Sequence, residues 1–213
     1  QTKDRTCSQI TKWVALAFKS RVCLFEGSFR KYHSELNLQS SSEKWFSEAV
    51  NASREIIESG EYLIHTNSSN ARLSYRDLFV NQSGNPPVDE AILSANCSST
   101  LSIFNDANWY YVSSTYGACL NLTKTFVNTY LNIDGTRFTD NANYNSLPFQ
   151  QEVKNRDLRL QQTIRMADYK RSDGSAAPPN FSYSSTGYHP IKYTLDSKVT
   201  DGVARNDNSI PIL

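Results

Sequence analysis

The chain has 213 residues, of which 38% are hydrophobic and 20% charged, so it is long enough to bury a sizeable core. Its 22 basic and 21 acidic residues leave a net charge of +1, which provides no field to recruit nucleic acids or anionic membranes. No apolar run approaches eighteen residues, so the sequence predicts no bilayer-spanning helix, and it shows no signal-peptide pattern.

Residues 8–62 predict two helices that fold back on each other. In the first, expected over residues 8–31, apolar side chains recur at steps of three and four, the period of one helix face. The second repeats this period. The side chains expected on the two buried faces are Ile10, Trp13, Val14, Ala17, Phe18, Val22 and Phe25, then Trp45, Phe46, Ala49, Ala52, Ile56 and Ile57. The small residues among them would let the two backbones approach closely.

The second helix also carries signals at its ends. Ser40 followed by Glu43 fits a capping box, and Gly60 stands where a left-handed C-cap is expected. A helix pair that packs aromatic residues against alanines is typical of the unit of tetratricopeptide-like solenoids. Elsewhere in the sequence we find no repeat at a fixed period.

Shorter elements follow the helix pair. Residues 75–79 predict a helical turn packed on the core, and residues 91–95 predict either a strand or the first turn of a buried element. Thr123 is expected to cap a helix with the sequence KTFVNTYLN, and Asp134-Gly135 is expected to turn the chain.

The last third of the chain predicts a helical turn and two short strands. Residues 153–169 change from helical to alternating spacing, and residues 188–195 alternate as a strand does. Arg156 or Arg159 is expected to lock its turn through forked hydrogen bonds to a carboxylate or to loop carbonyls. Because neither βαβ alternation nor a regular series of strands occurs, the predicted fold class is mainly α with long irregular loops and a few short β-strands.

The candidate ligand-binding site lies within residues 96–122, which have no steady period and are expected to form a long irregular loop. Sugars present apolar C–H faces beside hydroxyl edges, so flat aromatic rings and polar amides or carboxylates together suit them. Segment 104–116 supplies both kinds of side chain. The aromatic candidates are Trp109, Tyr110, Tyr111 and Tyr116, and the polar candidates are Asn105, Asp106 and Asn108. For each residue, the competing interpretation is that it anchors the loop to the helices.

The four cysteines show no CxxC motif and no zinc-type spacing. Cys23 lies among apolar residues and is expected to be a small buried side chain. Cys97 and Cys119 flank the same loop, so they could be bridged in an oxidising compartment.

Catalytic and metal-binding patterns are also missing from the sequence. Asn132-x-Asp134-Gly135 resembles the middle of a calcium loop, but Tyr130 and Asn141 stand where acidic ligands are needed. The three histidines follow no motif, and no nucleophile elbow, phosphate loop or dinucleotide fingerprint occurs. We therefore expect no catalytic residues, no metal and no cofactor.

Eight pieces follow one another along the chain: TKWVALAFKSRVCLFEG, SGEYLI, YRDLF, DEAILS, TKTFVNTYLNIDGT, NRDLRL, TGYHPIKY and NSIPIL. Their order resembles that of the SusD/RagB family of bacterial surface lipoproteins. In NRDLRL, Leu158 stands where the family often has proline. The resemblance extends over nearly the whole chain and implies that residues 1–213 form one domain fragment of a longer protein. Within it, residues 8–62 would be the helix pair and residues 80–213 the loop-rich ligand-binding portion.

What this resemblance implies is a tetratricopeptide-like α-α superhelix and a function without catalysis. The expected function is to bind an oligosaccharide or polysaccharide at the outer face of the outer membrane of Bacteroidetes. The expected partner is a SusC-like TonB-dependent transporter, which would receive the glycan. Membrane contact would be made only through a lipid anchor outside this sequence, and no nucleic acid would bind.

Two other functions remain open. One is a tetratricopeptide-like interaction scaffold that binds a protein and no sugar; it predicts exposed rather than buried aromatic residues on the helix pair. The other is a glycoside hydrolase fragment, which would need two carboxylates opposed across a cleft, for which Asp106 and Asp134 are the nominees.

Overall fold

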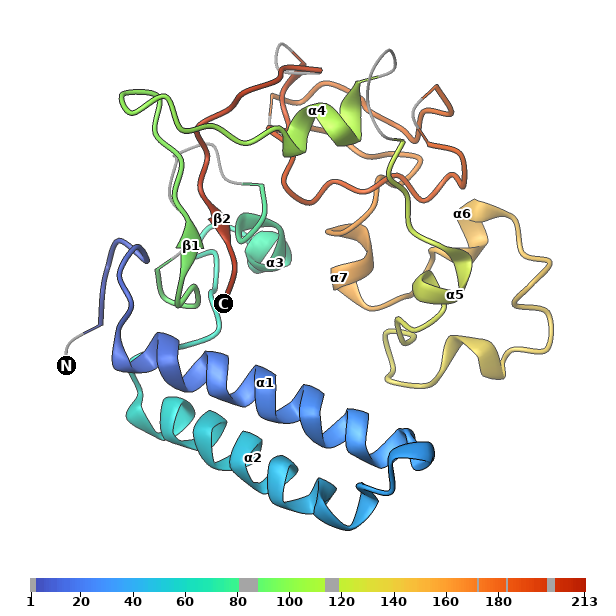
Figure 1. Cartoon of the computed structure of the whole chain (residues 1–213). Coiled ribbons are helices and arrows are strands. Elements are labelled where there is room, and N and C mark those ends of the chain that lie inside the picture. Colours follow the sequence, from blue (N-terminus) through green and yellow to red (C-terminus); the bar gives the residue numbers. More distant parts are fainter. Residues whose placement is uncertain (1–2, 81–87, 114–118, 172, 183, 199–201) are drawn as a thin grey trace. The chain divides into compact units, whose positions relative to one another are not determined.

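The computed structural model describes residues 3–80, 88–113, 119–171, 173–182, 184–198 and 202–213. It is mainly helical, with few short strands and long irregular stretches, as the sequence predicts (Figure 1). The chain divides into two compact units. The helix-pair unit contains the described residues of 1–65, 85–96 and 210–213, and the loop-rich unit contains those of 66–84 and 97–209.

The helix-pair unit is built on α1 (Lys12–Tyr32) and α2 (Ser42–Ser59), which lie antiparallel and side by side (Figure 1). Thr11 caps α1, because its hydroxyl accepts a hydrogen bond from the Val14 amide. Gly60 ends α2 in the left-handed conformation, with φ +68°, which only glycine adopts without strain. The predicted helix pair and its C-cap are therefore confirmed.

The predicted capping box does not form. Two short 3₁₀ turns, η1 (Ser34–Leu36) and η2 (Gln39–Ser41), join the helices, and α2 begins one residue after Ser41. The Ser41 hydroxyl donates to the Leu38 carbonyl and accepts from Arg30, so it is used in the connection rather than at the helix end.

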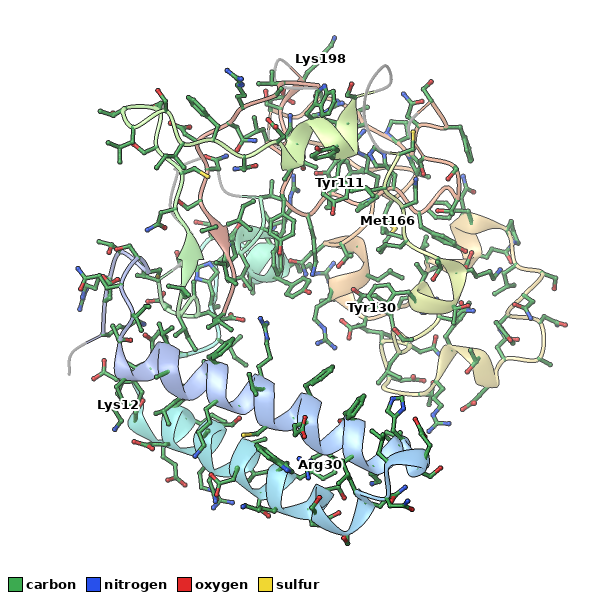
Figure 2. All side chains as sticks on the ribbon, viewed as in Figure 1. Lys12, Arg30, Tyr111, Tyr130, Met166 and Lys198 are labelled. Carbon is green, nitrogen blue, oxygen red and sulfur yellow. The ribbon has the colours of Figure 1, made fainter. Side chains whose placement is uncertain are left out.

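Small side chains line the contact between the two helices. Cys23 and Gly27 are buried on α1, and Ala49 and Ala52 are buried on α2. Ser20 hydrogen-bonds Ser53 across the pair. Arg30 extends from α1 toward α2 (Figure 2), and its guanidinium lies 5.2 Å from the centre of the half-buried Trp45 ring. This strip follows positions seven residues apart, such as 13, 20 and 27, which is the spacing of close helix pairs.

A second apolar strip on α1 was expected to be buried and is exposed. Phe18 is 59% exposed and Phe25 is 68% exposed, and Val22 between them is exposed as well. Ile10, which precedes α1, and Ile57 on α2 were also expected to be buried and are exposed. The physical reason is that one neighbouring helix covers one strip of α1, and the strip with small residues allows the closer approach. The described residues form one helix pair, and they do not stack a second pair on it as a superhelix would.

The rest of the helix-pair unit includes a two-stranded antiparallel sheet. Strand β1 (Ser94–Ala95) pairs with β2 (Ile210–Pro211), so one of the two predictions for residues 91–95 is confirmed. Cys7 is fully buried beside this sheet, and its thiol donates to the Ala91 carbonyl over 3.2 Å.

The loop-rich unit is built from short helices separated by turns. They are η3 (Ala71–Leu73), α3 (Ser74–Asp77), α4 (Ala107–Val112), α5 (Lys124–Val127), η4 (Phe138–Asp140), α6 (Phe149–Glu152) and α7 (Leu158–Gln161). Its core consists of two clusters joined by Met166; one contains Val127, Leu160, Ile164 and Tyr188, and the other Tyr169, Ala177 and Ile191. The predicted Thr123 cap is confirmed, since its hydroxyl accepts from the Phe126 amide.

The two strands predicted near the end of this unit are wrong. An isolated bridge between Ile164 and Pro190 replaces them, and the chain on either side forms turns. Tyr188 and Ile191 pack into different core clusters, and the chain turns directly after Ile191, where Tyr193 adopts φ +64°, so the alternating run does not continue as a strand.

The cysteines behave as small side chains. Cys23 is buried as predicted, and Cys97 and Cys119 are not disulfide-bonded to each other in the structure.

Candidate functional site

Segment 104–113 contains a six-residue helix, α4, in place of the irregular loop that the sequence predicts. Asn108 and Val112 face inward, one helical turn apart. The Trp109 and Tyr110 rings meet edge to face at 5.2 Å, with Trp109 half-buried and Tyr110 42% exposed. Tyr111 is half-buried and burial raises the pKa of its phenol. Tyr116 lies outside the described residues.

The polar candidates of this segment bind other parts of the same unit. Asn108 is 1% exposed; its amide donates to the Val203 carbonyl and accepts from the Leu195 amide. Asn105 donates to Asn206 and to the Asn208 carbonyl, and a bridge joins Asn105 to Asn206. These amides fasten α4 to residues 195–208, which is the anchoring interpretation weighed for each of them.

Asp106 has a different environment from the two amides. One carboxylate oxygen accepts from the Arg205 amide over 2.8 Å, while the residue itself is exposed. Within the predicted set, Tyr110, Asp106 and part of Trp109 are therefore placed to meet a ligand. The described structure brings all six of these neighbouring residues together on one short helix and its N-terminal turn.

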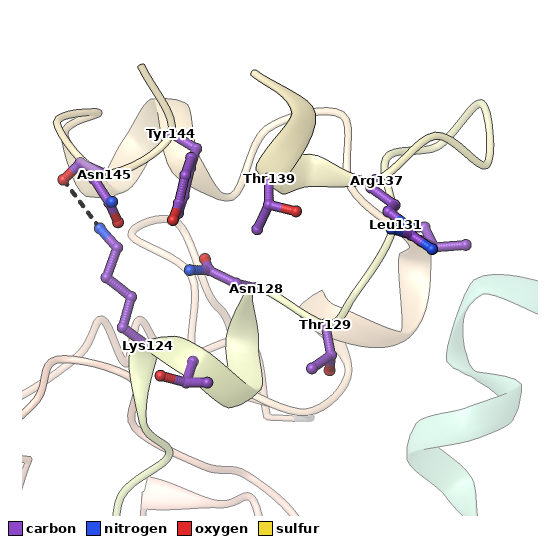
Figure 3. Close-up of a pocket in the computed structure, with 9 residues that line it drawn as sticks. Lys124, Asn128, Thr129, Leu131, Arg137, Thr139, Tyr144 and Asn145 are labelled. Atoms are coloured by element: carbon purple, nitrogen blue, oxygen red, sulfur yellow. Dashed lines mark hydrogen bonds between the residues drawn. The ribbon is translucent and has the colours of Figure 1, made fainter. Parts of the chain in front are cut away.

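A second candidate site, which the sequence did not reveal, is a pocket of about 500 Å³ beside α5 (Figure 3). We call it the α5 pocket. Its lining residues are Lys124, Thr125, Asn128, Thr129, Leu131, Arg137, Thr139, Tyr144 and Asn145.

A tight turn places the two walls of the α5 pocket opposite each other. Gly135 adopts φ +85°, its amide donates to the Asn132 carbonyl, and a bridge joins Leu131 to Arg137. Asp134 accepts from the amide and hydroxyl of Thr136, which tightens the turn and lowers the pKa of the Asp134 carboxyl. The chain then returns over α5.

Buried groups beneath the pocket hold the returning segment. Phe138 is buried, and its ring contacts Tyr144 edge to face at 6.2 Å. The Arg156 guanidinium lies 3.6 Å from the centre of the Phe138 ring. Lys124 spans the pocket, since its ammonium donates to the Asn145 carbonyl over 3.3 Å (Figure 3).

The α5 pocket is rich in groups that bond hydroxyls. It contains two cations, two amides and several hydroxyls beside one tyrosine ring, and none of its described lining residues carries a carboxylate. The Asn128 side chain extends toward Lys124 and Tyr144 (Figure 3). Within the described residues, its carbonyl oxygen is buried and makes no hydrogen bond, so one polar atom of this side chain is unsatisfied. The arrangement can hold a polar, hydroxylated ligand.

The sequence did not predict this pocket, because residues 137–149 form a polar run without a periodic signal. The available signal was the Asp134-Gly135 turn followed by the dense polar and aromatic run from Thr139 to Asn145. That signal remained ambiguous, because polar loops are common and only the tertiary fold shows that this one returns over α5.

The described residues contain no group of three or more His, Cys, Asp or Glu side chains arranged to hold a metal ion. None of the helices in this part of the chain combines the length and apolarity needed to cross a bilayer. Compared with protein-family models, curated proteins and solved structures, the chain has no match in any of the three.

Proposed function

We propose that the chain is part of a non-enzymatic glycan-binding protein of the SusD/RagB kind. It would bind an oligosaccharide or polysaccharide at the bacterial cell surface and deliver it to a SusC-like TonB-dependent transporter. The observation that carries the glycan-binding proposal is the α5 pocket, because it combines clustered hydroxyl, amide and cationic groups with the exposed side of a tyrosine.

The volume of the α5 pocket and the polar groups that line it both suit a sugar ligand. A volume of about 500 Å³ lies within the usual range of about 300–1,000 Å³ for small-ligand pockets. Hydroxyls and amides can both donate and accept, as the hydroxyl edge of a sugar requires. Tyr110 and Trp109 on α4 offer further aromatic surface in the same unit, so binding would rest on several weak contacts.

The remaining parts of this proposal come from the resemblance in motif order. The α1–α2 pair would be one unit of a tetratricopeptide-like superhelix in a longer chain. A lipid anchor outside this sequence would hold the protein at the outer face of the outer membrane. The transporter would be the protein partner.

Calorimetric titration of the chain with a panel of soluble polysaccharides tests the function. We expect one glycan to bind and Asn128→Ala to weaken it at least tenfold, because the variant removes an amide from the α5 pocket. Arg72→Ala is the matched surface control, since Arg72 is exposed and lies on η3. Trp109→Ala reports whether α4 contributes. Absence of binding to every glycan would contradict the proposal.

A protein-binding scaffold is the second candidate, and one observation favours it. Phe18 and Phe25 on α1 are exposed, as that alternative predicts, and a groove of about 450 Å³ runs along the pair, lined in part by Leu24, Val50 and Ile57. The same titration separates the two functions, because a scaffold of this kind would bind no sugar.

A further inference from the structure

The loop-rich unit contains a second cavity, of about 720 Å³, whose lining includes three cationic side chains. We call it the basic pocket. Its described lining residues are Arg165, Arg171, residues 175–182 and Lys198.

Two of its three cations are held rigidly. Arg171 is 8% exposed, and its guanidinium donates to the Ser175 hydroxyl and to the Ala176 carbonyl, both at 3.2 Å. Gly174, with φ +79°, closes the turn that brings Ser175 back to Arg171. Arg165 is buried as well, with its guanidinium 5.9 Å from the centre of the Tyr169 ring. Lys198 is exposed and extends outward (Figure 2).

None of the described residues that line the basic pocket carries a carboxylate. Two acidic residues lie near it in the chain. Asp196 pairs with Arg76 and with the Tyr169 hydroxyl. The Asp173 carboxylate accepts from Ser175, from Ser197 and from the Lys198 amide, so it lies at the edge of the pocket. Among the described residues, the three cations of the lining outnumber this adjacent carboxylate, which leaves the pocket positive in a protein whose net charge is only +1.

The neighbouring His189 side chain lies in the electrostatic field of the same two arginines. It is fully buried, and its Nε2 lies 3.0 Å from the Tyr111 carbonyl. Burial first, and then the charges of Arg165 and Arg171, lower the pKa of His189 from 6.5 to about 3. The imidazole is therefore neutral at neutral pH and adds no further positive charge.

Partly buried guanidinium groups favour an anionic partner. A guanidinium presents several donors in a fixed plane, which matches the paired oxygens of a carboxylate or sulfate. The burial of Arg165 and Arg171 strengthens this attraction, because water screens it less. The basic pocket also has an apolar rim, where Pro178 and Pro179 precede Phe181, which is 76% exposed. An exposed ring beside a cationic pocket fits a sugar with an acidic substituent.

We infer that the basic pocket binds the carboxylate or sulfate of an acidic glycan, with the sugar ring against Phe181. This inference rests on the proposed glycan-binding function and specifies its ligand class as acidic rather than neutral. Asn180 and Ser182 would bond hydroxyls of the same sugar.

Calorimetric titration with matched glycan pairs tests this inference. The ligands are oligogalacturonate and its methyl ester, chondroitin sulfate and its desulfated form, neutral polysaccharides, and sodium sulfate alone. We expect an acidic member of a pair to bind at least tenfold more tightly than its neutralised counterpart, and to bind less tightly as salt is raised. Lys198→Gln should weaken this binding several-fold and Arg165→Gln should weaken it further, while Arg72→Gln leaves it unchanged.

Each other outcome overturns the inference in a recognisable way. Equal binding of the neutralised glycans, or an unchanged affinity in Lys198→Gln, would show that the pocket does not read the acidic group. Lys198 is exposed, so this variant stays informative even where Arg165→Gln fails to fold. Binding of neutral polysaccharides alone would retain the proposed function and reject the acidic ligand. Binding of free sulfate without any glycan, or no binding at all, would reject both.

Discussion

Arg156 is a buried cation, and the sequence predicted that it would lock its turn through hydrogen bonds. Its guanidinium donates to the carbonyls of Glu152, Val127 and Tyr130 at 2.7–2.9 Å, which locks the turn beneath the α5 pocket. Arg159 instead pairs with the Asp157 carboxylate. Both predicted forms of forked hydrogen bonding are therefore present. Burial lowers the pKa of Arg156, yet the three carbonyls replace water around its charge.

Asn105 and Asn108 show that residue type alone does not reveal the hydrogen-bond partner of a side chain. An amide that can bond a sugar hydroxyl can equally bond a backbone amide or carbonyl. In the structure both bond to residues 87 to 103 positions later in the chain, namely Leu195, Val203 and Asn208. The identity of an amide in the sequence does not indicate which partner it will meet.

His189 makes the stability of the loop-rich unit depend on pH. The unfolded chain binds a proton on this histidine below about pH 6.5, whereas the folded chain does so only near pH 3, so unfolding is favoured as the pH falls through this window. Between pH 6.5 and 4.5 we expect the free energy of unfolding to fall by roughly 2 kcal/mol more in the wild type than in His189→Gln. Urea denaturation at each pH measures it. His33→Gln, at an exposed site, should retain the wild-type slope; equal slopes in wild type and His189→Gln would contradict the prediction.

At the scale of elements, the sequence predicts long periodic helices better than short ones. The α1–α2 pair follows from its period and its C-cap, because twenty or so residues repeat one signal. Helix α4 has six residues and is held by hydrogen bonds to a distant segment rather than by its own propensity. Helix α4 therefore depends on tertiary contacts, which its own sequence does not reveal.

Gly27 allows the close contact between α1 and α2. A Cβ atom at this position would lie 2.8 Å from two ring carbons of Phe46. We expect Gly27→Ala to lower the free energy of unfolding by about 1 kcal/mol, because the clash outweighs the gain of about 1 kcal/mol in helix propensity. Chemical denaturation followed by circular dichroism measures the change. In a Phe46→Leu background the same substitution should become neutral or stabilising; a stabilising effect in the wild type would contradict the clash.

At the scale of the whole molecule, the chain crosses between its two compact units more than once. The helix-pair unit takes its last strand from residues 210–213, far from α1 and α2 in sequence. Leu93 and Leu213 exchange backbone hydrogen bonds with each other, and Arg21 donates to the Ile212 carbonyl. The end of the chain therefore contributes to the unit that begins it.

Deleting residues 210–213 tests this organisation. Loss of several backbone hydrogen bonds should destabilise the helix-pair unit by about 2 kcal/mol. Trp13 and Trp45 report on that unit and Trp109 reports on the loop-rich unit, so single-tryptophan variants can follow each during urea denaturation. We expect the midpoint reported by Trp109 to change little. Ile212→Ser retains the backbone and is the control, with a loss below about 0.5 kcal/mol; equal shifts at both reporters would indicate one cooperative unit.

Local sequence patterns correctly predicted the helix pair, its C-cap, the Thr123 cap, the arginine-locked turn and the mainly helical class. Each of these features depends on residues within a few positions of one another, so hydrophobic periodicity and capping residues can be recognised directly in the sequence. Three features became visible only in the folded chain. Phe18 and Phe25 are exposed. Asn105 and Asn108 fasten α4. Residues from segments 124–145 and 165–198 line two pockets. The reason is that burial and pocket formation depend on which distant segment covers a given face, and local pattern does not encode that choice.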